Sequence, residues 1–136
     1  IGPVESKKAI LMQKEGKIIL LNKKNYDSLP AYLYHFSLCI IPFIDNDLTR
    51  AVDPIKIYEY LASGKEVVST PLPPLKRLSK FISLESDPKS FTKAVKNILD
   101  NPTSYDKAQS LSIEMNNHSW NYRAENIMNI FRNNIK

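Results

Sequence analysis

The sequence predicts an α/β fold in which a parallel sheet is flanked by helices, and three observations indicate it. Four short apolar runs are continuous rather than alternating, which is typical of strands covered on both faces. Helical segments lie between and after these runs. Strands that alternate with helices favour β-α-β units with right-handed crossovers. The four predicted strands are residues 17–22, 38–43, 66–71 and 81–85.

Five helices are expected, and the second of them carries the clearest signals. In this helix Asp53 suits the N-cap, Pro54 the first helical position and Gly64 the C-terminal cap. The third helix repeats the Asp-Pro start and carries one continuous apolar stripe. The predicted helices are residues 27–37, 53–64, 87–100, 104–117 and 119–134.

The last predicted helix places Trp120, Ala124, Ile127 and Phe131 on one face, with Ser119 as its cap. Such a stripe is more typical of packing than of ligand binding. Trp120 is therefore expected to be a packing anchor rather than a platform for a sugar ring.

Length and composition indicate a folded domain. A chain of 136 residues, of which 43% are hydrophobic and 24% charged, can bury a core, and residues 1–136 are expected to form a single domain. The net charge is +5, and the basic residues are scattered rather than grouped in a stripe, so binding to nucleic acid is not expected. This charge suits a solubilising surface, a phosphate-bearing ligand or peripheral contact with an anionic membrane surface.

The single cysteine and the first residues of the chain indicate where the protein is located and whether it is part of a longer chain. Cys39 lies in an apolar run, and a lone buried thiol suggests a reducing compartment such as the cytoplasm. No apolar run approaches the roughly 18–20 residues that cross a bilayer. The chain starts on Ile-Gly-Pro rather than Met, which suggests a piece of a longer protein.

Parallel sheets bind ligands beyond the carboxyl ends of their strands, so the segments that follow the strands are the candidates for a site. The segment after the second run is long and polar, and it leads directly into the helix over 53–64. A helix N-terminus offers free N–H groups and a partial positive charge that suit a phosphate. The four candidate segments are 22–27, 43–53, 71–77 and 86–87.

Lys56 and Glu59 are the two charged candidates on this helix. Lys56 lies in the first turn, where a cation opposes the helix dipole, and it could supply charge to a diphosphate. Glu59 could accept both hydroxyls of a ribose. The alternative is an ordinary surface ion pair between the two, three residues apart, which spacing alone slightly favours.

Other kinds of site have weaker support. The only glycines are Gly2, Gly16 and Gly64, so neither a dinucleotide-binding fingerprint nor a P-loop is present. His35 and His118 have no acid, Cys or second His at ligand spacing, so no metal is expected. No cofactor is indicated.

The segment VDPIKIYEYLASGKEVVSTPLP resembles the signature of group 1 glycosyltransferases, a large retaining family with the GT-B fold. The segments YDSLPAYLYHFSLCIIPF, NDLTRAVDP and HSWNYRAENI resemble further stretches of that family in the same order. The resemblance covers residues 17 to about 131. It implies a Rossmann-like, C-terminal domain of a two-domain enzyme, which binds a UDP- or GDP-linked sugar, and an N-terminal truncation of that domain.

The resemblance also implies roles for individual residues. Glu59 corresponds to the glutamate that holds the ribose hydroxyls, and Pro54, Ile55 and Lys56 to the turn that meets the diphosphate. Tyr26 lies in the turn that would contact the base. The loop 43–53, with Thr49 and Asp53, would face the donor sugar, whereas catalytic residues remain unassigned.

The sequence departs from the family pattern at three of these positions. The partner of the ribose glutamate, eight residues earlier, is Ala51 here. A family glycine is Asn22, and the proline after Gly-Lys is Glu66. Asp47 or Asp53 could take over the sugar contact. Residues that the family has before position 1, including a basic pair, are not in this sequence.

The implied function is transfer of a sugar from a nucleoside diphosphate to a glycan or envelope acceptor, in polysaccharide biosynthesis at the inner face of the membrane. The acceptor would be bound by the N-terminal domain that this sequence lacks. A non-catalytic nucleotide- or partner-binding module is the alternative, which Ala51 slightly favours. This chain alone is expected to be inactive and, because of exposed strand edges and a bare final helix, to self-associate.

Overall fold

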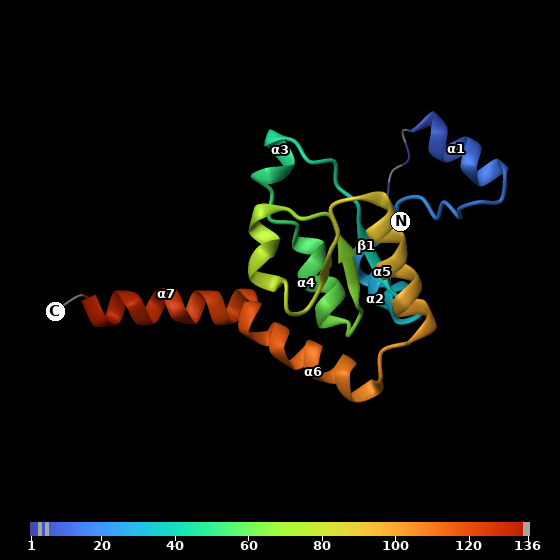
Figure 1. Ribbon diagram of the computed structural model, residues 1–136. Coiled ribbons are helices and arrows are strands. Elements are labelled where there is room, and N and C mark those ends of the chain that lie inside the picture. Colours follow the sequence, from blue (N-terminus) through green and yellow to red (C-terminus); the bar gives the residue numbers. More distant parts are fainter. Residues whose placement is uncertain (3, 5, 135–136) are drawn as a thin grey trace. The chain divides into compact units, whose positions relative to one another are not determined.

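The computed structural model describes residues 1–2, 4 and 6–134 of the chain. The chain divides into two compact units, residues 1–35 and 36–136. In Figure 1 the first unit is coloured blue to cyan, and the second runs from cyan to red.

The first unit contains three short helices. Its elements are α1 (Lys7–Lys14), the 3₁₀ helix η1 (Tyr26–Ser28) and α2 (Leu29–Tyr34). Helix α1, which the sequence analysis did not predict, is capped by Ser6, whose hydroxyl accepts a hydrogen bond of 3.3 Å from the Ala9 amide. Together η1 and α2 confirm the predicted helix over 27–37, although it starts as a 3₁₀ turn and ends three residues early.

The predicted strand over residues 17–22 is wrong. Ile18–Leu21 have no strand pairing within the described residues, and Ile19 is 84% exposed. The Leu20 amide donates instead to the side chain of Gln13 at 2.9 Å, and Asn22 adopts a positive φ of 54°. An apolar run predicts a strand only where a neighbouring strand can take up its backbone hydrogen bonds, and no such neighbour is described here.

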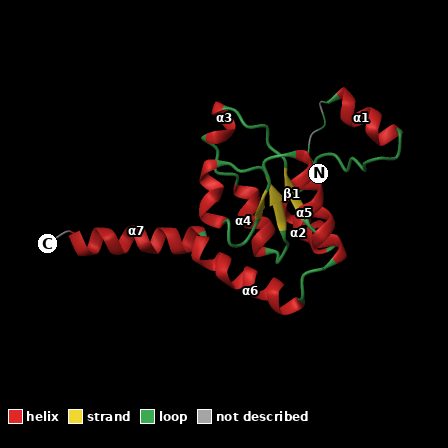
Figure 2. Cartoon of the chain, viewed as in Figure 1, coloured by secondary structure: helices red, strands yellow, loops and turns green. Residues whose placement is uncertain are grey.

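The second unit is built on a parallel sheet, which confirms the predicted α/β fold. Its three strands pair in the order β1-β2-β3, with Ile40 opposite Val68 and Ser69 opposite Leu84. Figure 2 shows the strands in yellow among the surrounding helices. Their bounds are β1 (Cys39–Ile41), β2 (Val67–Ser69) and β3 (Ser83–Leu84). The other three predicted strands are thus present in shortened form.

The helices of the second unit flank this sheet. Strand β2 contacts both α4 and α5, and α4 also packs along α6. The arrangement is consistent with a Rossmann-like fold. The predicted helices over 87–100, 104–117 and 119–134 are confirmed. The bounds are α3 (Asp47–Arg50), α4 (Ile55–Ala62), η2 (Pro73–Leu78), α5 (Pro88–Asp100), α6 (Tyr105–Met115), η3 (Asn116–His118) and α7 (Trp120–Asn134).

The hydrophobic core of this unit lies between β2 and the helices that cover it. All three residues of β2 are buried, as are two residues of α4 and two of η2. The buried apolar side chains are Cys39, Ile41, Ile57, Leu61, Val67, Val68, Leu72, Leu75, Leu78, Ile82, Leu111 and Met115.

Helix α4 ends as its sequence predicts. Gly64 adopts a φ of 69°, its amide donates to the Leu61 carbonyl at 2.9 Å, and the Lys65 amide donates to the Tyr60 carbonyl at 3.0 Å. This pair of bonds is a Schellman motif, which requires a left-handed residue and therefore favours glycine.

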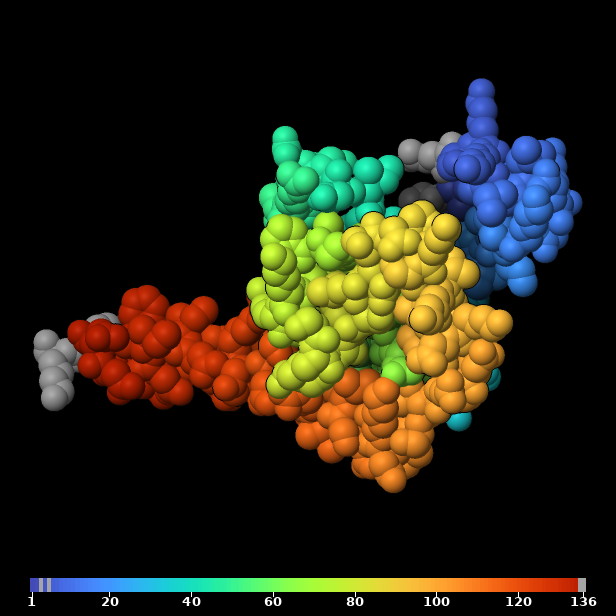
Figure 3. Space-filling model, viewed as in Figure 1, coloured from blue at the N-terminus to red at the C-terminus, as the bar shows by residue number. Residues whose placement is uncertain are grey.

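Helix α7 projects away from the rest of the second unit, as the labelled ribbon of Figure 1 and the red atoms of Figure 3 show. Its side chains Trp120, Ile127 and Phe131 are 72%, 54% and 57% exposed. The apolar face is bare, as predicted. The prediction that Trp120 is a packing anchor is wrong, because its side chain is 72% exposed. The indole ring contacts the guanidinium of Arg123 on the same helix.

The first prediction concerns Gly64, where a side chain would meet helix α6. A Cβ atom at Gly64 would lie 2.9 Å from Ala108 Cβ and 3.0 Å from the Ala108 carbonyl oxygen. Left-handed strain of about 1–2 kcal/mol and overpacking of about 1–3 kcal/mol should together lower the stability of Gly64→Ala in urea unfolding. Gly16→Ala is the matched control, because Gly16 has φ 70° and no atom within 4 Å. Equal losses in the two variants would contradict the close packing of α4 on α6.

A second prediction concerns the thiol of Cys39. Burial raises the pKa of Cys39 to about 11, an effect that nearby Lys65 partly opposes. At pH 8 on the order of one thiol in a thousand is therefore ionised, and the thiolate is the reactive form. A thiol reagent should modify Cys39 only after denaturant is added. Fast modification of the folded chain at pH 8 would refute this burial.

Candidate functional site

The three strands end close together, so the segments that follow them leave from one edge of the sheet. The Ile41 carbonyl at the end of β1 accepts hydrogen bonds from the Ser69 hydroxyl at 3.1 Å and the Thr70 amide at 3.2 Å. The Glu85 amide, just after β3, donates to the Ser69 carbonyl at 2.9 Å. This edge carries three of the four segments that the sequence singled out.

The loop after β1 is held by its own polar side chains. Arg50 binds Asp45 through two hydrogen bonds of 2.7 and 3.1 Å. This hydrogen bonding lowers the pKa of Asp45. Asn46 and Thr49 form a capping box at the start of α3, with side-chain to backbone distances of 2.9 and 3.0 Å. These side chains therefore hold the loop in its conformation.

Thr49, a predicted site residue, has its hydroxyl occupied by this capping box. The hydroxyl also donates to the Ile44 carbonyl at 2.6 Å. Its role in this structure is to shape the loop. Asp47, the alternative for a sugar contact, is fully exposed in the first turn of α3.

The start of α4 differs from the prediction. Pro54 is itself the N-cap, with φ −71° and ψ 110°, and Ile55 is the first helical residue. The prediction of Asp53 as N-cap is wrong, because its carboxylate accepts from Arg77 and Tyr58 instead of from backbone amides. No side-chain cap bonds the first turn of α4 among the described residues.

Asp53, Tyr58 and Arg77 form a cluster that joins α4 to η2. Arg77 Nη2 donates both to Asp53 Oδ2 and to the Tyr58 hydroxyl, and that hydroxyl lies 3.4 Å from each Asp53 carboxylate oxygen. The bond to Tyr58 and the carboxylate of Asp53 raise the pKa of Arg77. The cluster fixes the segment before α4 against the segment after β2.

The remaining predicted residues of α4 lie in its first two turns. Ile55 and Lys56 are exposed and Glu59 is half-buried. Lys56 makes none of the ion pairs found among the described residues, so the alternative of a Lys56–Glu59 pair is not formed in this structure. Tyr26 belongs to the first unit, where it opens η1 and is 68% exposed.

Sequence reasoning missed the aromatic and basic residues around Tyr58. The ring of His118 lies 5.5 Å from the Tyr58 ring, between centroids. The Arg123 guanidinium lies 5.5 Å from the Tyr58 ring and 5.5 Å from the Trp120 ring. Only Arg77 lay in a segment selected beforehand. Nothing in the spacing of the others indicated that η3 and the first turn of α7 lie beside α4.

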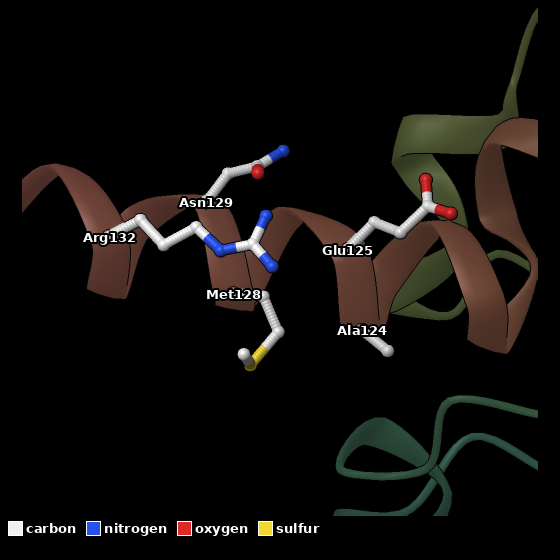
Figure 4. Close-up of a pocket in the computed structure, with 5 residues that line it drawn as sticks. All are labelled: Ala124, Glu125, Met128, Asn129 and Arg132. Atoms are coloured by element: carbon white, nitrogen blue, oxygen red, sulfur yellow. The ribbon is translucent and has the colours of Figure 1, made fainter.

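Two hollows lie elsewhere and contain none of the seven predicted site residues. One, drawn in Figure 4, is lined by side chains of α7 alone, among them Glu125 and Arg132. The other, of about 310 Å³, is at the amino ends of β2 and β3, where Lys107 pairs with Glu66.

Two kinds of feature are absent from the described residues. No helix in them is long and apolar enough to cross a membrane. Within the same residues no three His, Cys, Asp or Glu side chains gather closely enough to hold a metal ion.

Comparison with known proteins points to glycosyltransferases. The chain is 36% identical over 52 residues to a protein of Bacillus subtilis (strain 168). That protein is named "Putative teichuronic acid biosynthesis glycosyltransferase TuaH". The match covers 38% of this chain but only 13% of the relative's length. No family model and no solved structure matches the chain. A partial relationship to a glycosyltransferase is therefore what the comparisons support.

The third prediction tests the ion pair in the cluster. Asp53→Asn and Arg77→Gln should show a coupling free energy of about 0.5–1 kcal/mol in a double-mutant cycle, modest because both side chains are partly exposed. Added salt should reduce the coupling. The Asp45–Arg50 pair, which lies within residues 45–50, is the control for an ion pair that does not join α4 to η2. Additive effects of the two cluster substitutions would show that the pair does not join α4 to η2.

Proposed function

We propose that this chain is the donor-binding part of a retaining glycosyltransferase with the GT-B fold, and that it binds a UDP- or GDP-linked sugar. The observation that carries the proposal is the segment Asp53–Glu59, which lies beyond the carboxyl end of β1 in a chain related to a glycosyltransferase. Parallel sheets bind nucleotides at this edge.

The residues of that segment have distinct roles in the proposal. The free amides in the first turn of α4 and the ammonium group of Lys56 bind the diphosphate, since a helix N-terminus favours anions. Glu59, one turn further on, accepts the ribose hydroxyls. Tyr26 contributes to base binding, and Thr49 and Asp53 shape the loop beside the sugar.

The chain acts as one nucleotide-sugar-binding domain in this proposal, and residues beyond this sequence complete the enzyme. The acceptor, a glycan or other envelope component, binds to a separate N-terminal domain at the cytoplasmic face of the membrane. Catalysis then depends on positioning and on stabilising charge on the leaving diphosphate.

A non-catalytic nucleotide-binding module is the second candidate, and Ala51 favours it. This residue is the exposed C-cap of α3, at the position where the resembled family has the partner of its ribose glutamate. A methyl group cannot accept a hydrogen bond from a sugar. Such a module would bind nucleotides without transferring a sugar.

The fourth prediction tests donor binding through Glu59. UDP or GDP, with or without a sugar, should raise the melting temperature of the chain by mass action. Glu59→Gln should weaken this binding by about 1.5–3 kcal/mol in calorimetry, because hydrogen bonds to a charged group are lost. Lys56→Ala should weaken the binding of nucleoside diphosphates more than the binding of nucleosides.

Glu125→Gln on the exposed helix α7 is the matched control and should leave nucleotide affinity unchanged. A panel of nucleotides at millimolar concentration that produces no thermal shift would count against the proposed site. If Glu59→Gln and the unmodified chain bind nucleotides with equal affinity, Glu59 is not part of the proposed site. Nucleotide binding without sugar transfer in a chain carrying its acceptor domain would select the second candidate.

A further inference from the structure

Arg123 is a half-buried cation whose charge is not balanced by a carboxylate in the described part of the chain. It lies in the first turn of α7, after the capping residue Ser119. Its guanidinium lies over two aromatic rings, Tyr58 and Trp120, at 5.5 Å from each centroid. Among the residues described it makes no side-chain hydrogen bond and no ion pair. Since no carboxylate among the described residues pairs with this guanidinium, its N–H groups can donate to an acceptor.

A second arginine approaches the same tyrosine. The Arg77 guanidinium lies 6.0 Å from the centre of the Tyr58 ring, and its charge is compensated by Asp53. The two guanidinium groups therefore share one ring, but only one of them has a carboxylate partner. This leaves an excess of one positive charge beside Tyr58.

The elements that meet around Tyr58 supply few further acids. The 3₁₀ helix η2 contributes Lys76 and Arg77, and η3 contributes His118, with no Asp or Glu in either. The acid of α4 is Glu59, next to Tyr58 in sequence, and the acid of α7 is Glu125, two residues after Arg123. The surface is basic and aromatic, with Trp120 72% exposed beside Arg123.

We propose that Arg123 binds the oxyanion of an anionic sugar whose ring lies against the exposed indole of Trp120. A guanidinium presents its donors in a planar fork that matches a phosphate or a carboxylate. An indole offers a flat apolar face to the carbon-bound hydrogens of a sugar ring. The contacts proposed here do not involve Lys56 or Glu59, to which the donor-binding proposal assigns the diphosphate and the ribose.

The fluorescence of Trp120 tests this site directly, because the sequence contains one tryptophan. Glucose 1-phosphate and glucuronate are titrated separately, with glucose as the neutral control. A saturable change is expected with at least one anion and not with glucose. The tighter anion identifies whether the oxyanion is a phosphate ester or a carboxylate.

Arg123→Gln should weaken binding of the tighter anion at least tenfold, measured by calorimetry because the substitution also alters the surroundings of the indole. Arg132→Gln is the matched control on the same helix and should leave the affinity unchanged. Arg123→Lys keeps the charge without the planar fork, and should bind several-fold more weakly than the unmodified chain. This variant serves as the test if Arg123→Gln does not fold.

Glu59→Gln separates this proposal from the donor-binding proposal. The substitution should leave the affinity for the anionic sugar unchanged and should weaken the binding of nucleotides. The proposal is overturned if neither anion produces a saturable change or if glucose binds equally well. It is also overturned if substitution of Arg132 weakens binding as much as substitution of Arg123, or if a folded Arg123→Lys variant binds as tightly as the unmodified chain.

Discussion

The burial of strand β2 determines how the second unit is arranged. Val67, Val68 and Ser69 are exposed by 1% or less, so both faces of the strand and both of its edges are covered. A parallel strand can be covered in this way only if the chain crosses over as helices between its neighbours. Each crossover then brings the chain back in the same direction. The polar segments that follow β1, β2 and β3 therefore lie together at the carboxyl ends of the strands.

Ser69 shows how this buried strand also determines the local geometry of these ends. Its hydroxyl is fully buried, and a buried hydroxyl without a partner is costly. It donates to the Ile41 carbonyl at 3.1 Å, which ties the end of β1 to the end of β2. The loop to Asp53 leaves from the first of these strands and the segment to Arg77 from the second. Their ion pair therefore joins two segments whose starting points are already fixed.

The sequence predicted the parts of this fold whose signals are local, although the observed strands are shorter than the predicted ones. Caps such as Asp87 and Ser119, the glycine at the end of α4 and three of four strands follow from neighbouring residues. The failures depend on distant partners. The apolar run at 17–22 has no described strand to pair with, and Asp53 binds a guanidinium 24 residues away. The approach of Arg123 to Tyr58 spans a still longer separation, which no local pattern encodes.

Helix α4 has eight residues, fewer than the roughly 12–15 needed for appreciable stability in isolation, so its position is set by tertiary contacts. At its C-terminal end Gly64 lies against Ala108 of α6, and along its middle Ile57 and Leu61 are fully buried. Its N-terminal end has no side-chain cap within the described residues, and the Asp53–Arg77 pair together with the Tyr58 ring supplies the external support there. Because this end also carries Lys56, the contacts that stabilise the helix also orient the groups to which we assign the diphosphate in the proposed function.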